Sequence, residues 1–409
     1  MKTTLSFLLL FSILFTTLPS CKNQDKKEET SSSDLLVDKD KKWSERFALS
    51  EIHRFPDPTK LDFQEKPRWS YTNGLVLQAM SREYERSNNQ EIYDYIYEYA
   101  DKMINEDGSI NTYKLKNYNL DMIKSGDVMY YLYNKTNEER FRIAMDTLHK
   151  QMEGQPTTSE GGYWHKKRYP FQMWLDGVYM AEPFHAKYIT SYMSGDEQKE
   201  ALDKLVKQFD LIEKHSRDPE TGLYYHGWDE SKEQKWADNE TGLSSHFWSR
   251  GMGWYSMAMA DIIELLPENH EGRERIKMYL NRFVEAIVKY QDESGVWYQV
   301  VDLPEREGNY KEATGTCMFT YAIAKGVKKG YLPESYMQYA EKGYDGIHKE
   351  FISVDEDGIV NLNKCCSVAG LGGNQYRDGS FEYYIGEKIR SNDPKGTGPF
   401  IMASLILDK

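Results

Sequence analysis

A single aspartate lies between two aromatic residues in the stretch from Phe171 to Met180, which contains Trp174, Asp176 and Tyr179. Bulky apolar neighbours remove water from a carboxylate, which favours its neutral form and raises its pKa. A carboxyl group with a raised pKa can donate a proton near neutral pH. The same residues also suit an aspartate that caps a helix, with both aromatic rings in the core. The stretch therefore predicts a general acid, with a helix cap as the alternative.

Clusters of aromatic and polar residues recur at the expected starts of several helices. They are Trp69-Ser70-Tyr71, Asn119-Leu120-Asp121, Trp174-Leu175-Asp176, Trp248-Ser249-Arg250 and Thr314-Gly315-Thr316. Helix caps would account for Asp or Thr at such places, but not for the repeated Trp, Tyr and Arg. If the helices run in one direction around a ring, their starts converge at one mouth. The clusters then predict a polar, aromatic-walled pocket.

The elements that would position these clusters are helices. From about Trp43 onward, apolar residues recur with helical periodicity on one face of each segment. Three such faces are Leu75, Val76, Ala79, Met80 and Tyr84; Trp254, Met257, Ala258, Ile262 and Leu265; and Phe319, Ile323 and Val327. Strand-like alternation is confined to short pieces such as residues 295–300. This pattern indicates an all-α body.

A turn element with acidic residues, a glycine and then apolar residues appears five times along the chain. Its glycines are Gly108, Gly162, Gly222, Gly295 and Gly358, at steps of 54, 60, 73 and 63 residues. Each step holds two helices and their connections, which predicts a solenoid or a closed ring of helix pairs. No short fixed-period repeat consensus is present, so the closed ring is favoured. The expected fold is an (α/α)6 barrel formed as one domain by residues 43–409.

The net charge of -13 argues against nucleic acid as a partner, because the chain has no basic stripe to neutralise phosphates. An acidic ligand would need locally placed Arg, His or polar donors. Three of the four cysteines, Cys317, Cys365 and Cys366, show no zinc-type spacing, and the adjacent pair suits no mutual disulfide.

The first residues form a targeting segment, with Lys2, an apolar run from Leu5 to Leu18, and Cys21 after Pro19 and Ser20. This end resembles a bacterial lipoprotein cleavage site, with residues 1–21 as the signal and Cys21 as the lipidated residue. Residues 22–42, rich in charged residues and serine, are expected to be a flexible tether. The body would then be anchored to the outer membrane, facing the periplasm or the cell surface. Simple secretion is the alternative.

Several strings, in the order in which they occur, resemble glycoside hydrolase family 105, the unsaturated rhamnogalacturonyl hydrolases, and more distantly the family 88 unsaturated glucuronyl hydrolases. The resemblance extends from about Trp69 to Ile406. The strings are residues 68–75, 118–121, 172–177, 226–229, 248–254, 312–316 and 396–400. Residues 367–373 and 385–389 depart from the expected pattern, and we expect that loop to shape substrate choice.

The resemblance implies that Asp176 is the catalytic acid/base and Asp121 an assisting carboxylate. It further implies that the sugar subsite is lined by Tyr71, Trp174, His226, Arg250 and Trp254. The residues alone leave alternatives open: Asp121 as a cap, His226 as a structural histidine and Arg250 as an ion-pair partner. Trp69 is assigned to the core, and Arg377 is left outside the site.

The implied substrates are lyase-generated oligosaccharides whose terminal uronic acid carries a C4=C5 double bond, an enol ether. Protonation of C4 by Asp176 and addition of water at C5 would break the linkage, and this chemistry requires no metal or organic cofactor. The helix dipole lowers the pKa of Asp176, whereas burial beside Trp174 and repulsion from Asp121 raise it. Trp174 and Trp254 are expected to flank the flat ring.

Two other functions fit the same residues. One is an inverting glycosidase, which needs carboxyl groups roughly 6.5–9.5 Å apart. The other is a lipoprotein that binds sugars without cleaving them. Within the hydrolase hypothesis, rhamnogalacturonan, ulvan, arabinogalactan and glycosaminoglycan fragments all remain possible substrates. A sulfated substrate would favour an additional cation near the second sugar, for which Lys166, Lys167, Arg168 and Arg377 are candidates.

Overall fold

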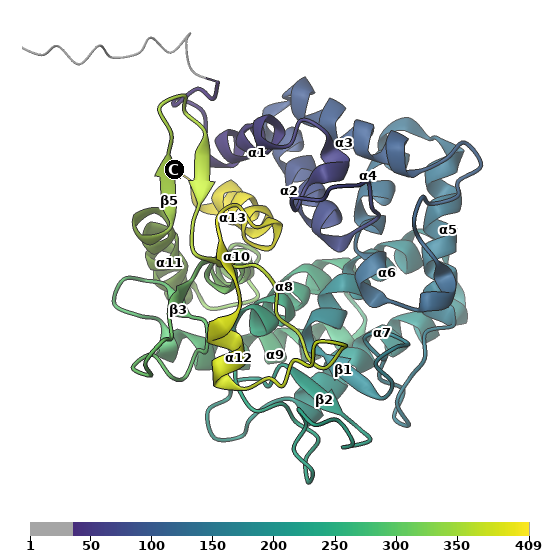
Figure 1. Ribbon diagram of the computed structural model, residues 1–409. Helices are drawn as coiled ribbons and strands as arrows, with labels where there is room; N and C mark the ends of the chain where they lie inside the picture. Colours follow the sequence, from purple (N-terminus) through teal and green to yellow (C-terminus); the bar gives the residue numbers. More distant parts are fainter. Residues whose placement is uncertain (1–35, 409) are drawn as a thin grey trace, which may run out of the picture.

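Helices in two concentric layers make up most of the computed structural model, which describes residues 36–408 (Figure 1). The inner layer consists of α2 (Tyr71–Ser87), α4 (Gly126–Thr136), α6 (Leu175–Tyr192), α8 (Ser249–Leu265), α10 (Ala313–Lys328) and α13 (Pro394–Leu407). The outer layer consists of α1 (Trp43–Arg54), α3 (Gln90–Met103), α5 (Glu139–Glu153), α7 (Gly195–His215), α9 (Glu271–Ile287) and α11 (Met337–Glu350). A short helix, α12 (Phe381–Gly386), lies in the last long loop.

The inner helices form a closed ring. Each contacts the next inner helix along the chain, and α13 packs against α2 to complete the circle. The outer helices pack on this ring, for example α7 on α6 and α9 on α8. The backbone N–H of Trp43, at the start of α1, donates to Asp408 Oδ2 at 2.7 Å, just after α13. The predicted (α/α)6 barrel is confirmed.

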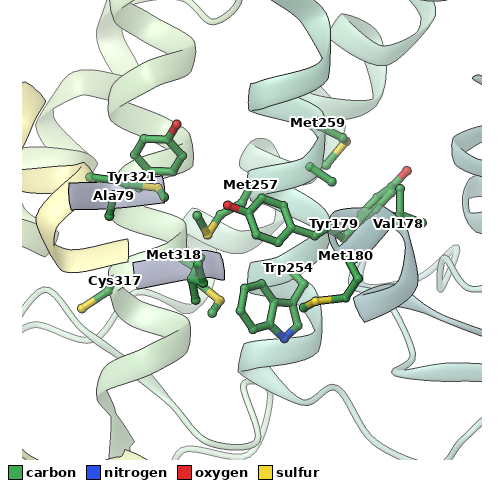
Figure 2. Packing of buried hydrophobic residues seen from close by; sticks show 14 of the residues in the cluster. Ala79, Val178, Tyr179, Met180, Trp254, Met257, Met259, Cys317, Met318 and Tyr321 are labelled. Carbon is green, nitrogen blue, oxygen red and sulfur yellow. The ribbon is translucent and has the colours of Figure 1, made fainter. Parts of the chain in front are cut away.

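The two layers differ in burial because they differ in sequence. Every residue of α10 from Ala313 to Val327 is buried, and α8 is buried from Ser249 to Ile263. A helix that is apolar around most of its surface must lie inside, whereas the amphipathic outer helices bury one face. Figure 2 shows the resulting core, in which Tyr179 of α6 lies beside Trp254 of α8 and near Met318 of α10.

A buried ion network also lies in the barrel interior. Asp261 of α8 accepts hydrogen bonds from Tyr321 Oη at 2.6 Å and Lys325 Nζ at 2.7 Å. Its second oxygen accepts from Arg82 of α2 at 3.1 Å. These ion pairs and hydrogen bonds connect three inner helices across the ring.

The repeated turn element forms a small hairpin after an outer helix. Its glycine has positive φ in all five copies: Gly108, Gly161, Gly222, Gly295 and Gly358. The looser copy therefore turns at Gly161, not at the predicted Gly162. In the last copy, β5 (Ile352–Val354) pairs antiparallel with β6 (Val360–Leu362). A side chain at Gly358 would place its Cβ 2.1 Å from the carbonyl oxygen of Val37, so this close approach requires glycine.

Short antiparallel strand pairs connect the starts of the inner helices. They are β1 (Gln172–Trp174) with β2 (Gly227–Asp229), β3 (Trp297–Tyr298) with β4 (Lys311–Glu312), and β7 (Cys365–Cys366) with β8 (Ile389–Arg390). Single-turn 3-10 helices complete the connections: η2 (Pro58–Lys60), η3 (Leu115–Asn117), η4 (Leu120–Ile123), η5 (Val288–Tyr290) and η6 (Glu334–Tyr336). Figure 1 shows α12 on the same side of the molecule as β1 and β2.

The folded body begins earlier than the predicted boundary at residue 43. The N–H groups of Leu36 and Val37 donate to the carbonyl of Asp357, and Val37 is fully buried. Leu36 and Val37, at the end of the predicted tether, are therefore docked on the β5–β6 hairpin. The signal segment 1–21, Cys21 and most of the predicted tether lie outside the described residues. No helix between residues 36 and 408 combines the length and apolar character of a membrane span.

Candidate active site

Asp176 is the second residue of α6, and its side chain does not cap that helix. The residue at the N-cap position is Trp174, which makes no side-chain capping bond. Asp176 Oδ2 instead lies 3.1 Å from His226 Nε2, and the aspartate side chain remains 15% exposed. The capping alternative is thus not what the structure shows for Asp176.

His226 is fixed by both its backbone and its ring. Its carbonyl accepts a hydrogen bond from the N–H of Leu175 at 3.1 Å, which joins the β2 strand to the start of α6. Its Nδ1 lies 2.9 Å from the hydroxyl of Tyr384 in α12. The imidazole is fully buried, so its orientation toward Asp176 is set before any substrate binds.

Asp121 repeats this arrangement one helix pair earlier. The N–H of Leu120 donates to the carbonyl of His165 at 3.1 Å, and His165 Nε2 lies 3.1 Å from Asp121 Oδ1. Lys166 Nζ contacts the other carboxylate oxygen at 2.5 Å. The cap of η4 is Asn119, which accepts from the N–H of Asp121. Asp121 is therefore a paired carboxylate and not a cap.

The same backbone bond recurs around the mouth. Ser249 donates its N–H to Gln299 at 3.0 Å, and Ala313 donates to Lys364 at 3.1 Å. The residues that follow these donors, Arg250 and Thr314, hold the position in α8 and α10 that Asp176 holds in α6. The predicted clusters thus occupy equivalent positions around one end of the barrel.

The two carboxylates carry charge in the free protein. Burial raises the pKa of Asp176, but the positive charge and hydrogen bond of His226 outweigh it, and the net pKa lies below the ordinary value. Burial also raises the pKa of Asp121, and the nearby Lys166 and His165 hold it well below its usual range. The expectation of a raised pKa at Asp176 is therefore wrong for the free protein, because the sequence did not reveal its histidine partner. The negative charge of Asp121 still raises the pKa of Asp176, in the expected direction.

Trp174 lies beside the carboxylates within a stack of rings. The His165 ring is 4.5 Å from the indole at an interplanar angle of 17°, and the Tyr169 ring is 5.1 Å away at 20°. Trp236 and Leu371 complete this apolar cluster, and the indole is only 5% exposed. The ring therefore offers no free face for stacking on a sugar in this structure.

Arg377 organises the loop that departs from the expected family pattern. Its guanidinium donates to the carbonyls of Gly372 and Leu371 and to the hydroxyl of Tyr169, at 2.8, 3.0 and 3.0 Å. The arginine thereby ties the loop to the ring that stacks on Trp174. Its Nε and Nη2 donors are thus engaged within the protein.

Trp254 and Arg250 are buried deeper than expected. Trp254 is 1% exposed and stacks on Tyr179 at 5.2 Å (Figure 2). It therefore belongs to the barrel core and does not form an exposed wall of a sugar subsite. Arg250 is also 1% exposed and donates to the carbonyl of Cys366 and to Thr314 Oγ1. It has no carboxylate partner within ion-pair distance among residues 36–408. Trp69 is buried as expected.

Tyr71 contacts the buried Trp254 on one side and lines an open cavity on the other. Its ring contacts Trp254 edge-on at 6.4 Å, and it lines a cavity of about 670 Å³ together with Asp121 and Ser70. Cavities of roughly 300–1,000 Å³ are the size that small ligands occupy. The structure therefore places Asp121 and Tyr71 in the lining of a cavity of ligand size, whereas Asp176 is not among the residues that line it.

Four residues that contact the predicted site were not predicted as members of it: His165, Tyr169, Tyr384 and, as a partner of Asp121, Lys166. The basic run of residues 166–168 was noted only as a candidate contact for sulfate. The sequence feature that could have indicated His165 is its position immediately before that basic run. No sequence feature indicated Tyr384, because its contact with His226 joins residues that are 158 positions apart.

Comparison with known proteins gives one consistent result. The family described as Glycosyl Hydrolase Family 88 matches residues 43–407. A family 105 glycoside hydrolase of solved structure from C. acetobutylicum ATCC 824 is 46% identical, with a TM-score of 0.85, over 90% of this chain and 99% of that chain. Protein Atu3128 of Agrobacterium fabrum is 34% identical over 240 residues, which cover 56% of this chain and 99% of that protein. The unsaturated rhamnogalacturonyl hydrolase YesR of Bacillus subtilis is 27% identical over 312 residues, 74% of this chain and 81% of YesR.

Proposed function

This chain belongs to glycosyl hydrolase family 88, and from this premise we propose that Asp176 is the proton donor that lets it remove the unsaturated uronic acid from lyase-generated oligosaccharides. The observation that supports this role is the unequal pairing of the two carboxylates. Asp121 faces a lysine and a histidine, whereas Asp176 faces a histidine alone. The glycoside hydrolase assignment follows from the family, and the roles of single residues are our proposal.

Because their partners differ, the two carboxylates have different roles in the proposed reaction. Lys166 and His165 keep Asp121 charged, so it provides a permanent negative charge beside the reacting ring. Asp176 has one partner, and its protonation state responds to the charges around it. A substrate carboxylate bound nearby raises the pKa of Asp176, because a like charge disfavours ionisation. Substrate binding would thus produce the protonated donor that the free protein lacks.

The reaction follows from the enol ether. Asp176 transfers its proton to C4, the electrons of the C4=C5 bond form the new C–H bond, and positive charge is shared between C5 and the ring oxygen. Asp121 stabilises that charge. Water adds at C5 and returns a proton to Asp176, which restores the acid. The resulting hemiketal opens to a C5 ketone, and the C1 hemiacetal collapses to an aldehyde with release of the neighbouring sugar.

The substrate class that we propose is a rhamnogalacturonan- or ulvan-type fragment. The similarity to YesR, an unsaturated rhamnogalacturonyl hydrolase, supports the former. We also propose that Cys21 carries a lipid that anchors the protein at the outer membrane, on the basis of the signal segment alone. Detergent-dependent extraction of the full chain, lost in Cys21→Ala, is the expected result, and extraction without detergent for both would contradict the anchor.

The test of the activity follows the ultraviolet absorbance of the conjugated C4=C5 bond. The protein without residues 1–21 is mixed with lyase digests of rhamnogalacturonan, ulvan and glycosaminoglycans. We expect absorbance to fall with at least one digest, and Asp176→Asn to slow that loss by about 10²–10⁴-fold. Asp196→Asn is the matched control, since Asp196 is the exposed second residue of outer helix α7. Equal rates for Asp176→Asn and the wild type would exclude Asp176 as the donor.

A further inference from the structure

The cavity beside Asp121 has a strongly basic lining. Five of its lining residues are cations: Arg68, Lys116, Lys166, Lys167 and Arg168. They come from three separate segments, namely the residues before α2, the η3 turn and the loop before β1. Three segments that are distant in sequence therefore place positive charge around one space of about 670 Å³.

Both carboxylates that line this cavity already have basic partners. Asp121 pairs with Lys166 and His165, and Asp62 forms an ion pair with Arg390 from β8. Within residues 36–408, no ion pair or side-chain hydrogen bond engages Arg68, Lys116, Lys167 or Arg168. Lys167 and Arg168 contact only aromatic faces, those of Tyr118 and Tyr169, at 5.4 and 4.8 Å.

This arrangement differs from an ordinary solvated surface. On α7, for comparison, exposed lysines alternate with carboxylates and pair with them, as Lys199 does with Asp203 and Lys204 with Glu200. The whole chain has a net charge of -13, yet four unpaired cations gather around one cavity. Like charges held together repel, and a bound anion removes that repulsion.

The position of the cavity relative to the two carboxylates connects it with the proposed substrate. Trp174, which contacts the histidine partners of both carboxylates, is packed in the apolar cluster with Leu371, in the loop that Arg377 holds. On the Asp121 side, Ser70, Tyr71 and the four cations surround open space. Under the proposed function, this cavity is the open space available to the part of the oligosaccharide that lies beyond the cleaved bond.

We propose that Arg68, Lys116, Lys167 and Arg168 form an anion-binding subsite for the sugars beyond the cleaved bond. The chemistry that fits is a sulfate ester or a carboxylate on the second or third sugar, because guanidinium groups bind such planar or tetrahedral oxyanions through paired donors and lysine adds a point charge. This inference rests on the proposed function and names its substrate class: oligosaccharides that carry a second anionic group, in addition to the terminal uronate.

The test compares pairs of substrates that differ in one anionic group. The first pair is an unsaturated disaccharide with sulfated rhamnose and its desulfated form. The second pair is a longer oligosaccharide with a further uronate and its carboxyl-reduced form. The variant is Lys116→Gln/Lys167→Gln/Arg168→Gln. The matched control is Lys66→Gln/Lys114→Gln, which neutralises exposed cations adjacent in sequence that do not line the cavity.

We expect the wild type to prefer the anionic member of at least one pair, measured as a ratio of kcat/KM. The triple variant should lower that ratio by at least about tenfold, chiefly through KM, because each charged hydrogen bond lost has about that effect. The control should keep the wild-type ratio. Loss of preference in the first pair identifies sulfate, and loss in the second identifies carboxylate. Equal ratios in the wild type and the triple variant for both pairs would overturn the proposal.

A binding measurement separates this proposal from the proposed activity. Calorimetry with a saturated sulfated disaccharide and with a saturated uronate-containing oligosaccharide needs no hydrolysis. Weaker binding by the triple variant than by the wild type supports the subsite even where no unsaturated substrate is consumed. Hydrolysis by the wild type with identical binding and identical ratios for the triple variant retains the activity and rejects the subsite.

Discussion

The imidazole of His226 lies 3.1 Å from the carboxylate of Asp176, although the two residues belong to different repeats of the barrel. Asp176 is at the start of α6, and His226 immediately precedes β2 in the connection between α7 and α8. Asp121 and His165 stand in the same relation one repeat earlier. Each carboxylate therefore receives its charge partner from the following connection.

Replacing His226 with Gln should raise the pKa of Asp176, because the electrostatic interaction and the hydrogen bond with His226 are among the causes that lower it. Protonated Asp176 is the reactive form in the proposed mechanism, so the basic limb of the kcat/KM profile should move to higher pH. Tyr384→Phe keeps the imidazole and should move the limb less. The measurement is the pH profile of enol ether loss, and coincident basic limbs for His226→Gln and the wild type would contradict the assignment.

Replacing Arg377 with Gln should lower activity without altering substrate preference. Arg377 holds the loop over Trp174 through Tyr169 and two backbone carbonyls. Loss of these bonds loosens the loop for every substrate, so kcat/KM should fall by about tenfold for anionic and neutral members of a pair alike. The check is the ratio of the two kcat/KM values. A selective loss on the sulfated member would instead mean that Arg377 contacts the sulfate.

Replacing Asp261 with Asn should destabilise the barrel. The substitution leaves the buried Lys325 with Glu264 as its remaining carboxylate and leaves Arg82 without one, and breaking a buried pair in this way costs about 3–5 kcal/mol. Denaturant unfolding at pH 7 measures the effect. Glu200→Gln is the control, because Glu200 pairs with Lys204 on the solvent side of α7 and its loss should leave the midpoint unchanged. A midpoint for Asp261→Asn equal to that of the control would show that the network is dispensable.

The stability of the fold should decrease below neutral pH partly because of His185 in α6. Burial lowers the pKa of His185 to about 4, below the 6.5 of an exposed imidazole. The unfolded chain therefore binds a proton that the folded chain does not, and stability is full above about pH 6.5 and falls as the pH decreases toward 4. The contribution between pH 7 and pH 5 is about 2 kcal/mol. Urea unfolding of His185→Gln should show a correspondingly smaller difference between those two pH values, and an undiminished difference would argue against this source.

The barrel was predictable because its signals are local. The apolar faces of the inner helices and the glycine turns can be read from neighbouring residues, and all five turn glycines fall within one residue of their predicted positions. The clusters at the helix starts were predictable for the same reason. A helix that begins at Leu175 or Ser249 fixes which residues face the mouth.

The partners of the carboxylates were not predictable. His226 and Asp176 are 50 positions apart in the sequence. The intervening connections differ in length from repeat to repeat, so the spacing does not predict which residue will face Asp176. This gap also explains the error in the pKa of Asp176, because the apolar neighbours are visible in the sequence and the opposing histidine is not. The burial of Trp174 depended likewise on Trp236 and Leu371, which come from two other loops.

The backbone bonds from Leu120 to His165 and from Leu175 to His226 have a consequence for how such an enzyme can diverge. Each aspartate–histidine pair spans the junction between two repeats, so neither repeat contains a complete pair that could be duplicated or exchanged alone. The residues between an outer helix and its hairpin can lengthen, shorten or change, provided that the junction keeps its register. The connections can thus change during evolution, while each aspartate–histidine pair is inherited only with the intact ring.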